Sequence, residues 1–221
     1  TMHAFEIEEI EKHGDDTVLD FKVLPDRAGY CLSHMHIARE VAALLKLTFS
    51  PVAIDIQAHD SSEKNTSDKA VSIVIEEDAK SHCSLYIGRI IDGIKNGPTP
   101  DQYKTFLEAI GQRSINTVVD LTNYVMFDLG QPMHAFDGEK VRGGLVTRYA
   151  RAGESITTLD NRNVILDSSI VIIADDAHPL AIAGIKGGKI AETTNTTKHI
   201  ILESAHFDGS YVRKTGTRLN I

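Results

Sequence analysis

The sequence predicts an α+β fold, with mixed or antiparallel sheets and a few helices. Two observations carry this prediction. From residue 70 onward, short stretches of alternating apolar and polar residues follow one another closely, as is typical of half-buried strands. Helical patterns are fewer and do not alternate regularly with the strands, which argues against a doubly wound parallel sheet. A small strand–helix segment precedes this region.

Composition and charge exclude several classes of protein. The 221 residues are 42% hydrophobic and 24% charged, with a formal net charge of −8. This charge argues against nonspecific coating of a nucleic-acid backbone, although a local basic groove for one RNA end is compatible with it. No apolar run approaches the ~20 residues of a membrane span, and no signal peptide is visible. Cys31 and Cys83 lie far apart, which indicates reduced thiols. We therefore expect a cytoplasmic protein with no membrane partner.

The N-terminal region, residues 1–56, is predicted to be the remnant of a small module. Alternation predicts a strand over 19–23, and Ser33 is a plausible N-cap for a helix with apolar positions between 37 and 44. One strand and one helix bury too little surface to fold alone, so this region should lean on another domain. The polar stretch 57–69 is predicted to be a linker or loop.

The rest of the chain is predicted to be one domain, 70–221, built mainly of strands. Thr99 supplies a capping hydroxyl for a helix that Gly111 closes. Asp160 and Asn161 are typical of a hairpin turn. Alternating or continuous apolar runs predict strands near residues 71–75, 85–91, 144–150, 163–166, 170–174, 180–185 and 199–204.

The most informative segment runs from Arg113 to Asp137. Apolar residues at helical spacing predict a helix over its first half, and Gly130 followed by Pro132 ends that helix just before His134. Burying unpaired polar groups costs about 1–3 kcal/mol each. So many polar side chains in an apolar setting therefore indicate a site rather than a solvated face. They are Arg113, Asn116, Asp120, Thr122, Asn123, Gln131, His134 and Asp137.

Other arrangements that suggest chemistry are better explained structurally. His34 and His36 have no Cys or acidic partner at a suitable spacing, so no metal site is predicted. His82 and Cys83 are adjacent on a predicted strand and therefore point to opposite faces, which excludes a thiol–imidazole pair.

Two further features leave alternatives open. The glycine-rich run 183–189 lacks the Ser or Thr that must follow the lysine of a phosphate loop, so its glycines form either a close wall against a ligand or a tight turn. Glu203 interrupts the apolar run 200–205. It is either a strand-end carboxylate facing solvent or a buried one with a partner or a role.

These motifs resemble, in the correct order, the editing module of the bacterial phenylalanine–tRNA ligase beta subunit family. The matching residues are 113–137, Leu159-Asp160, Ala183-Gly184 with Gly187-Gly188, and Leu202-Glu203-Ser204-Ala205. Residues 25–27 and 37–42 resemble the stretch just before that module. The resemblance implies that 70–221 is the editing domain, truncated at its C-terminal end.

By this resemblance, the chain contributes post-transfer editing: it hydrolyses tyrosine that has been wrongly esterified to phenylalanine tRNA. A pocket built for phenylalanine cannot strongly reject a near-isostere that adds a hydroxyl, whereas a second site with buried polar groups can select for that hydroxyl. The implied partners are the aminoacylated tRNA end and an alpha subunit in a two-alpha, two-beta assembly. ATP and Mg²⁺ serve the whole ligase, and this chain needs no cofactor of its own.

The resemblance also implies roles for single residues. His134 and Asn123 would be catalytic, binding the aminoacyl and terminal-adenosine region and helping to place a water molecule. The substrate-binding residues would be Glu203, which accepts a hydrogen bond from the tyrosine phenol, with Thr122, Arg113, Ala183 and Gly184 around it. Two other functions remain open: a non-catalytic module that binds the tRNA end or a neighbouring subunit, and a free-standing trans-editing deacylase. The match upstream of residue 46 argues against the latter.

Overall fold

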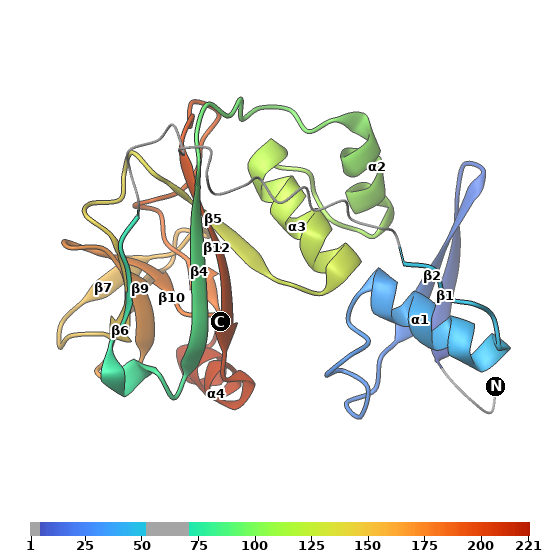
Figure 1. Cartoon of the computed structure of the whole chain (residues 1–221), viewed down its shortest axis with the longest axis horizontal. Coiled ribbons are helices and arrows are strands. Elements are labelled where there is room, and N and C mark those ends of the chain that lie inside the picture. Colours follow the sequence, from blue (N-terminus) through green and yellow to red (C-terminus); the bar gives the residue numbers. More distant parts are fainter. Residues whose placement is uncertain (1–4, 52–70) are drawn as a thin grey trace, which may run out of the picture. The chain divides into compact units, whose positions relative to one another are not determined.

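A computed structural model describes residues 5–51 and 71–221 (Figure 1). The described chain forms an α+β structure, as predicted, and divides into two compact units. Residues 98–132 belong to the same unit as the N-terminal region, and the strand-rich remainder forms the second unit. The predicted linker 57–69 lies outside the described residues, and the predicted domain limits stay a prediction.

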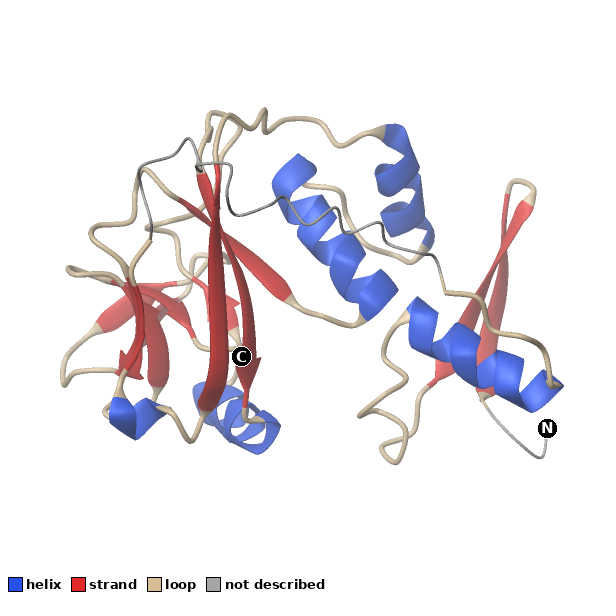
Figure 2. Ribbon diagram, viewed as in Figure 1, coloured by secondary structure: helices blue, strands red, loops and turns tan. Residues whose placement is uncertain are grey.

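The first unit contains a hairpin and three helices (Figure 2). Strand β2 and the helices occur where the sequence predicts them. Strand β1 was not predicted, because its residues are all exposed and it has no buried face to give a clear pattern. The elements are β1 (Glu6–His13), β2 (Asp16–Lys22), α1 (His34–Leu45), α2 (Asp101–Ala109) and α3 (Thr117–Leu129).

Local chemistry fixes the ends of these helices. Ser33 is the N-cap of α1, as predicted, and its hydroxyl accepts a hydrogen bond from the backbone N–H of His36. Gly130 ends α3 with a φ of +83°, a left-handed conformation that favours glycine. A methyl group at Gly130 would lie 3.3 Å from Ser33 Cβ, so the end of α3 closely approaches the start of α1. The N-terminal helix therefore leans on α3.

The buried carboxylate of Asp120 ties together the loops that precede α2 and α3. It accepts hydrogen bonds from the hydroxyls of Thr99 and Ser114 and from the backbone N–H of Ile115. The prediction that Thr99 caps α2 is wrong, because Pro100 holds the N-cap position and the Thr99 hydroxyl is bonded to Asp120.

The second unit consists of two main sheets, a short hairpin and one α-helix (Figure 1). A five-stranded sheet has the order β11-β10-β9-β6-β3, in which only the β3–β6 pair is parallel. A three-stranded antiparallel sheet has the order β4-β12-β5. The elements are β3 (Ile73–Ile75), a 3₁₀ turn (Glu77–Ala79), β4 (Cys83–Ile91), β5 (Met133–Asp137), β6 (Leu145–Tyr149), β7 (Ser155–Thr157), β8 (Asn163–Ile165), β9 (Val171–Ala174), β10 (Pro179–Ile182), β11 (Lys186–Gly187), β12 (Ile200–Phe207) and α4 (Gly209–Leu219).

Strand β9 lies at the centre of the core, and all four of its residues are buried. Successive side chains of a strand point to opposite faces of the sheet. Ile173 therefore packs in a cluster with Phe136 and Ile201 of the three-stranded sheet, and Ile172 packs in a second cluster with the β7–β8 hairpin. The five-stranded sheet therefore packs against the three-stranded sheet at Phe136 and Ile201, while His134 on the same face of β5 remains half-buried.

Candidate functional site

Glu203 and His134 are direct cross-strand neighbours. In the antiparallel β12–β5 pair, Glu203 lies opposite His134, so their side chains emerge on the same face of the sheet. Phe136 and Ile201 stand two residues along on this face and belong to the core. Glu203 is only 9% exposed, so the interpretation of it as a solvent-facing residue at a strand end is wrong. The structure thus brings together two predicted site residues that are 69 positions apart.

The Glu203 carboxylate is held by a phenol from the neighbouring strand. Tyr86 on β4 donates a hydrogen bond from its hydroxyl to Glu203 Oε2 at 2.7 Å. Burial raises the pKa of Glu203 from 4.5 to about 7, and the hydrogen bond from Tyr86 opposes this rise. Near neutral pH the group is therefore divided between a carboxylic acid and a carboxylate, and both forms hydrogen-bond to a hydroxyl.

His134 presents a neutral imidazole. Its ring makes an edge-to-face contact with Phe136, with the ring centroids 4.6 Å apart. Burial lowers the pKa of His134 from 6.5 to about 4, well below the ordinary value on which the sequence-based expectation rested. Neither ring nitrogen has a hydrogen-bond partner among the described residues. The unprotonated nitrogen is therefore available as an acceptor at neutral pH.

Gly187 in β11 forms the close wall of this site. A methyl group at position 187 would lie 2.6 Å from His134 Cε1 and 3.0 Å from Nε2, so the backbone passes directly against the imidazole. For Ala183 and Gly184, the predicted role as a wall against the substrate stays a prediction, and the structure gives their local contacts. Ala183 is buried in the core, and Gly184, with a φ of +68°, faces Phe207 and Val212. Of the two uses left open for the glycine run, Gly187 fits the wall and Gly184 fits the turn.

The three other predicted site residues belong to the first unit. Thr122 in α3 donates its hydroxyl hydrogen bond to the carbonyl of Val119, one helical turn earlier, at 2.7 Å. Asn123 is half-buried on the same helix, and Arg113 is exposed in the loop before it. Their participation in one site with Glu203 and His134 stays a prediction.

Several other polar residues of the 113–137 segment have structural partners. Asn116 is the N-cap of α3 and accepts a hydrogen bond from the N–H of Val119. Asp137 accepts hydrogen bonds from the Thr197 hydroxyl and from the backbone of Glu139. Some polar residues of this segment therefore cap a helix or connect loops, so the number of polar residues in the segment is larger than the number available to form a site. The position of Asn116 directly before the helical spacing is a cap signal that the sequence analysis missed.

Both lysines of the glycine-rich run are paired with carboxylates. Lys186 pairs with Asp160 at 3.3 Å and Lys189 pairs with Glu192 at 3.1 Å, so neither lysine points to a free phosphate cradle. In the described part of the chain, no group of three or more His, Cys, Asp or Glu residues is arranged to hold a metal ion. His36 instead shares a hydrogen bond with the Ser33 hydroxyl, in agreement with its structural interpretation.

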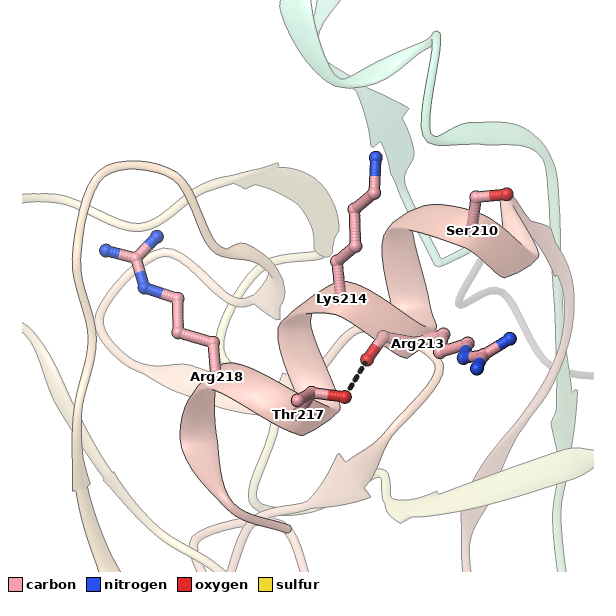
Figure 3. Close-up of a pocket in the computed structure, with 5 residues that line it drawn as sticks. All are labelled: Ser210, Arg213, Lys214, Thr217 and Arg218. Carbon is pink, nitrogen blue, oxygen red and sulfur yellow. Dashed lines mark hydrogen bonds between the residues drawn. The ribbon is translucent and has the colours of Figure 1, made fainter.

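The outer face of α4 is a second candidate site, an open hollow with positive charge (Figure 3). Arg218 pairs with Asp167 at 2.8 Å, whereas Arg213 and Lys214 have no ion pair within the residues the structure describes. The helix was not predicted, although Tyr211, Thr215 and Leu219 recur at helical spacing. The hollow is lined by Ser210, Arg213, Lys214, Thr217 and Arg218, which recur every three or four residues and are all exposed.

Comparison with known proteins places these sites in a family. Residues 82–221, which include both candidate sites of the second unit, match the B3/4 domain family. The chain belongs to this family. The B3/4 match begins one residue before β4 and includes Tyr86, His134, Gly187 and Glu203. It also covers the segment 113–137, from which the sequence-based resemblance was drawn.

The curated relatives of this B3/4 chain are phenylalanine–tRNA ligase beta subunits. The protein of Moorella thermoacetica is 41% identical over 93% of this chain and 25% of its own length. The proteins of Geobacter metallireducens and Symbiobacterium thermophilum are 42% and 37% identical, over 93% and 94% of this chain and 25% and 23% of their own lengths. The chain thus spans about a quarter of the relatives it matches, and the predicted resemblance to the beta subunit family is confirmed.

A solved structure is also similar to the B3/4 chain. It is an N-terminal fragment of the phenylalanyl-tRNA synthetase beta subunit from Pyrococcus horikoshii, with 12% identity and a TM-score of 0.49 over 94% of this chain and 61% of that one. Across the described residues, none of the helices is long and apolar enough to cross a membrane.

Proposed function

We propose that this chain provides post-transfer editing within a phenylalanine–tRNA ligase beta subunit, by hydrolysing tyrosine wrongly esterified to phenylalanine tRNA. The observation that carries the proposal is the cross-strand pair of Glu203 and His134. One member recognises a hydroxyl, and the other offers an unprotonated nitrogen beside it.

Selection for tyrosine follows from the buried state of Glu203. A phenol hydroxyl donates to the ionised carboxylate or accepts from the protonated one, so tyrosine satisfies the group in either form. Phenylalanine in the same position leaves a buried polar group unpaired, which costs about 1–3 kcal/mol. The carboxylate already binds the Tyr86 phenol, which supports its suitability for this kind of partner.

Hydrolysis needs a positioned water molecule rather than a strong base. Water oxygen forms the new bond to the ester carbon, the ester C–O bond breaks, and the water proton ends on the ribose oxygen that leaves. Neutral His134 accepts a hydrogen bond from the attacking water and relays its proton. Because a pKa of about 4 makes His134 a weak base, orientation supplies much of the acceleration. Asn123, Thr122 and Arg113 remain proposed contacts to the aminoacyl-adenosine end.

The proposal extends to the assembly in which the chain works. The whole ligase would use ATP and Mg²⁺ for aminoacylation, with an alpha subunit in a two-alpha, two-beta assembly in the cytoplasm. Editing itself takes place in this chain and uses only its own side chains and water.

Deacylation of tyrosyl-tRNA tests this function. Purified chain would be incubated with tyrosine mischarged on phenylalanine tRNA, alongside His134→Gln and Glu203→Ala variants, with His178→Gln as a matched histidine control in the same unit. We expect release of tyrosine by the wild type and the control, and a loss of about a hundredfold in kcat for His134→Gln. For Glu203→Ala we expect the preference for tyrosine over phenylalanine to disappear. Release no faster than in buffer by the wild-type chain would overturn the proposal.

A second candidate function is RNA binding without catalysis, favoured by the exposed basic face of α4. Arg213 and Lys214, with the paired Arg218 beside them, lie on one exposed helix face and suit the phosphates of an RNA backbone, in a chain whose net charge is −8. Gel-shift binding of deacylated phenylalanine tRNA separates the two candidates. Tight binding with no release of tyrosine favours the binding module, and release of tyrosine favours the deacylase.

A further inference from the structure

Among the described residues, Tyr86 alone donates a hydrogen bond to the specificity carboxylate of Glu203. In the β4–β12 ladder, Tyr86 lies opposite Ala205, and Gly88 lies opposite Glu203. Tyr86 is therefore the diagonal neighbour of Glu203 on the same face, a separation that a long aromatic side chain spans. Its hydroxyl reaches Glu203 Oε2 at 2.7 Å, and its side chain is only 8% exposed.

Gly88 lies directly opposite Glu203 and brings no side chain of its own to this position. A methyl group at position 88 would lie 2.6 Å from Ile73 Cδ1, so Ile73 packs against the backbone there. The carboxylate is thus bonded on the diagonal by Tyr86 and flanked on the other strand by His134. Two neighbours of different chemistry fix its place on the sheet.

The bond to Tyr86 uses only part of the carboxylate. A carboxylate offers about four lone-pair sites on its two oxygens, and Oε1 has no hydrogen-bond partner among the described residues. Burial and the charge of Glu203 both raise the pKa of Tyr86, so the phenol remains a proton donor throughout the physiological range. The Tyr86 hydroxyl therefore donates to Oε2 throughout this pH range, and Oε1 of Glu203 can accept a hydrogen bond from another group.

We propose that Tyr86 is a positioning residue for specificity: its phenol fixes Glu203 Oε2 so that Oε1 is presented to the hydroxyl of the substrate. This inference rests on the proposed editing function and goes further by assigning the orientation of the carboxylate to a residue of the chain. A bound tyrosine and Tyr86 then share one carboxylate, each donating to a different oxygen. Phenylalanine leaves Oε1 unpaired.

Tyr86→Phe removes the hydroxyl and retains the ring. On tyrosyl-tRNA we expect KM to rise about tenfold, as for loss of one hydrogen bond to a charged group, with kcat within about twofold because His134 is untouched. The preference for tyrosine over phenylalanine falls by the same factor. A purely structural role for Tyr86 would instead lower the active fraction and hence kcat, with KM and the preference unchanged.

The pH profile gives a readout that packing alone would not move. The hydrogen bond from Tyr86 lowers the pKa of Glu203, so its removal shifts the titration of Glu203 to higher pH. The other titratable groups near the carboxylate are Cys83 on β4 and His134 on β5, and neither is altered by the substitution. Carbon-13 NMR of the labelled Glu203 carboxyl measures this titration directly in the folded chain.

Tyr211→Phe is the matched control. It also removes a hydrogen-bonded phenol, but one that donates to the Ser169 carbonyl and accepts from the Val171 N–H. Thermal melting should register a loss for both variants, whereas only Tyr86→Phe should change KM, the tyrosine preference and the Glu203 titration. A higher rate of tyrosine release by Tyr86→Phe would show that Tyr86 competes with the substrate, and would overturn the proposal.

Binding measurements separate this inference from the proposed function. The probes are 3′-amino-3′-deoxyadenosine carrying tyrosine or phenylalanine through a stable amide, measured by calorimetry. If the wild type prefers the tyrosyl probe and Tyr86→Phe retains the whole preference, Tyr86 is not a positioning residue and editing stands. If the wild type neither distinguishes the probes nor releases tyrosine, the editing function itself fails, and the inference fails with it.

Discussion

The two candidate sites of the second unit place ionisable side chains in opposite environments. Glu203 and His134 lie on the core-facing side of a sheet. Burial raises the pKa of Glu203 and lowers the pKa of His134, so it favours the neutral form of each. Arg213 and Lys214 extend from the exposed face of α4. The first pair has a fixed orientation, given by strand register and one hydrogen bond, and the second is carried on long side chains in water.

This difference suits the buried pair to discrimination between similar ligands, and the exposed cations to attraction of a nucleic-acid backbone. A buried group that loses its partner suffers the full desolvation cost, so it distinguishes ligands that differ by one hydroxyl. Exposed cations attract any phosphate backbone, over a distance that salt shortens, and carry little information about the amino acid. Substitutions at Glu203, at Gly187 and on α4 test whether the two regions divide the work in this way.

Glu203→Gln should have the largest effect, on the pH dependence of stability. The folded-state pKa of about 7 lies above the ordinary 4.5, so the stabilising contribution of the protonated carboxyl is fully present below pH 4.5 and is lost as the pH rises through 7. Relative to the variant, the wild type should lose about 3 kcal/mol of unfolding free energy between pH 4.5 and 8. Urea unfolding at the two pH values measures this difference. A difference that is independent of pH would contradict burial of the carboxyl, and Arg213→Gln serves as the exposed control.

Gly187→Ala should act on His134 with a somewhat smaller effect. The added methyl group would overlap the imidazole, so the ring must move by about an ångström, which typically reduces kcat by about a hundredfold. Steady-state release of tyrosine from mischarged tRNA measures the loss. Gly188→Ala is the matched control, because its methyl group would meet the Leu180 carbonyl and Ile156 rather than His134. Equal losses of kcat in both variants at equal stability would refute the assignment of Gly187 to the site.

Removal of the α4 cations should have the smallest effect on catalysis. In the double variant Arg213→Gln, Lys214→Gln, we expect the slope of log affinity for tRNA against log salt to fall by about 2, since each phosphate contact contributes about 1. The preference for tyrosine should not change. Fluorescence anisotropy with labelled tRNA over a salt series measures the slope, and Lys80→Gln, directly after the 3₁₀ turn, is a control for removal of an exposed cation away from α4. An unchanged slope would remove α4 from RNA binding.

Periodic patterns predicted most of the fold, because they record which face of an element is buried. The strand near 170–174 and the helix of 113–137 were found in this way, and the turn at Asn161 was identified from residue type and has a φ of +64°. The pattern failed for β1, which buries nothing, and for α4, whose residues are mostly polar despite the helical spacing of its few apolar ones. Exposed elements show weak hydrophobic periodicity in the sequence, because few of their residues need to be apolar to pack against a core.

The site was only partly predictable, because its geometry depends on register. Glu203 and His134 could be named from the sequence, but their direct opposition required the β12–β5 pairing. Tyr86 was missed, since a tyrosine in an alternating strand is ordinary and only the diagonal contact with Glu203 distinguishes it. The sequence suggested an ordinary pKa for His134. Burial lowers this pKa to about 4, and no local sequence pattern indicates how deeply a histidine is buried.

The central position of β12 determines when the site can assemble during synthesis of the chain. This strand lies between β4 and β5 and carries the acceptor for Tyr86 across 117 positions of the chain. During translation, both flanking strands leave the ribosome well before their shared partner, and contacts of such long sequence separation form slowly. A nascent chain therefore contains His134 before it contains Glu203, and the cross-strand pair forms only when β12 is inserted between β4 and β5.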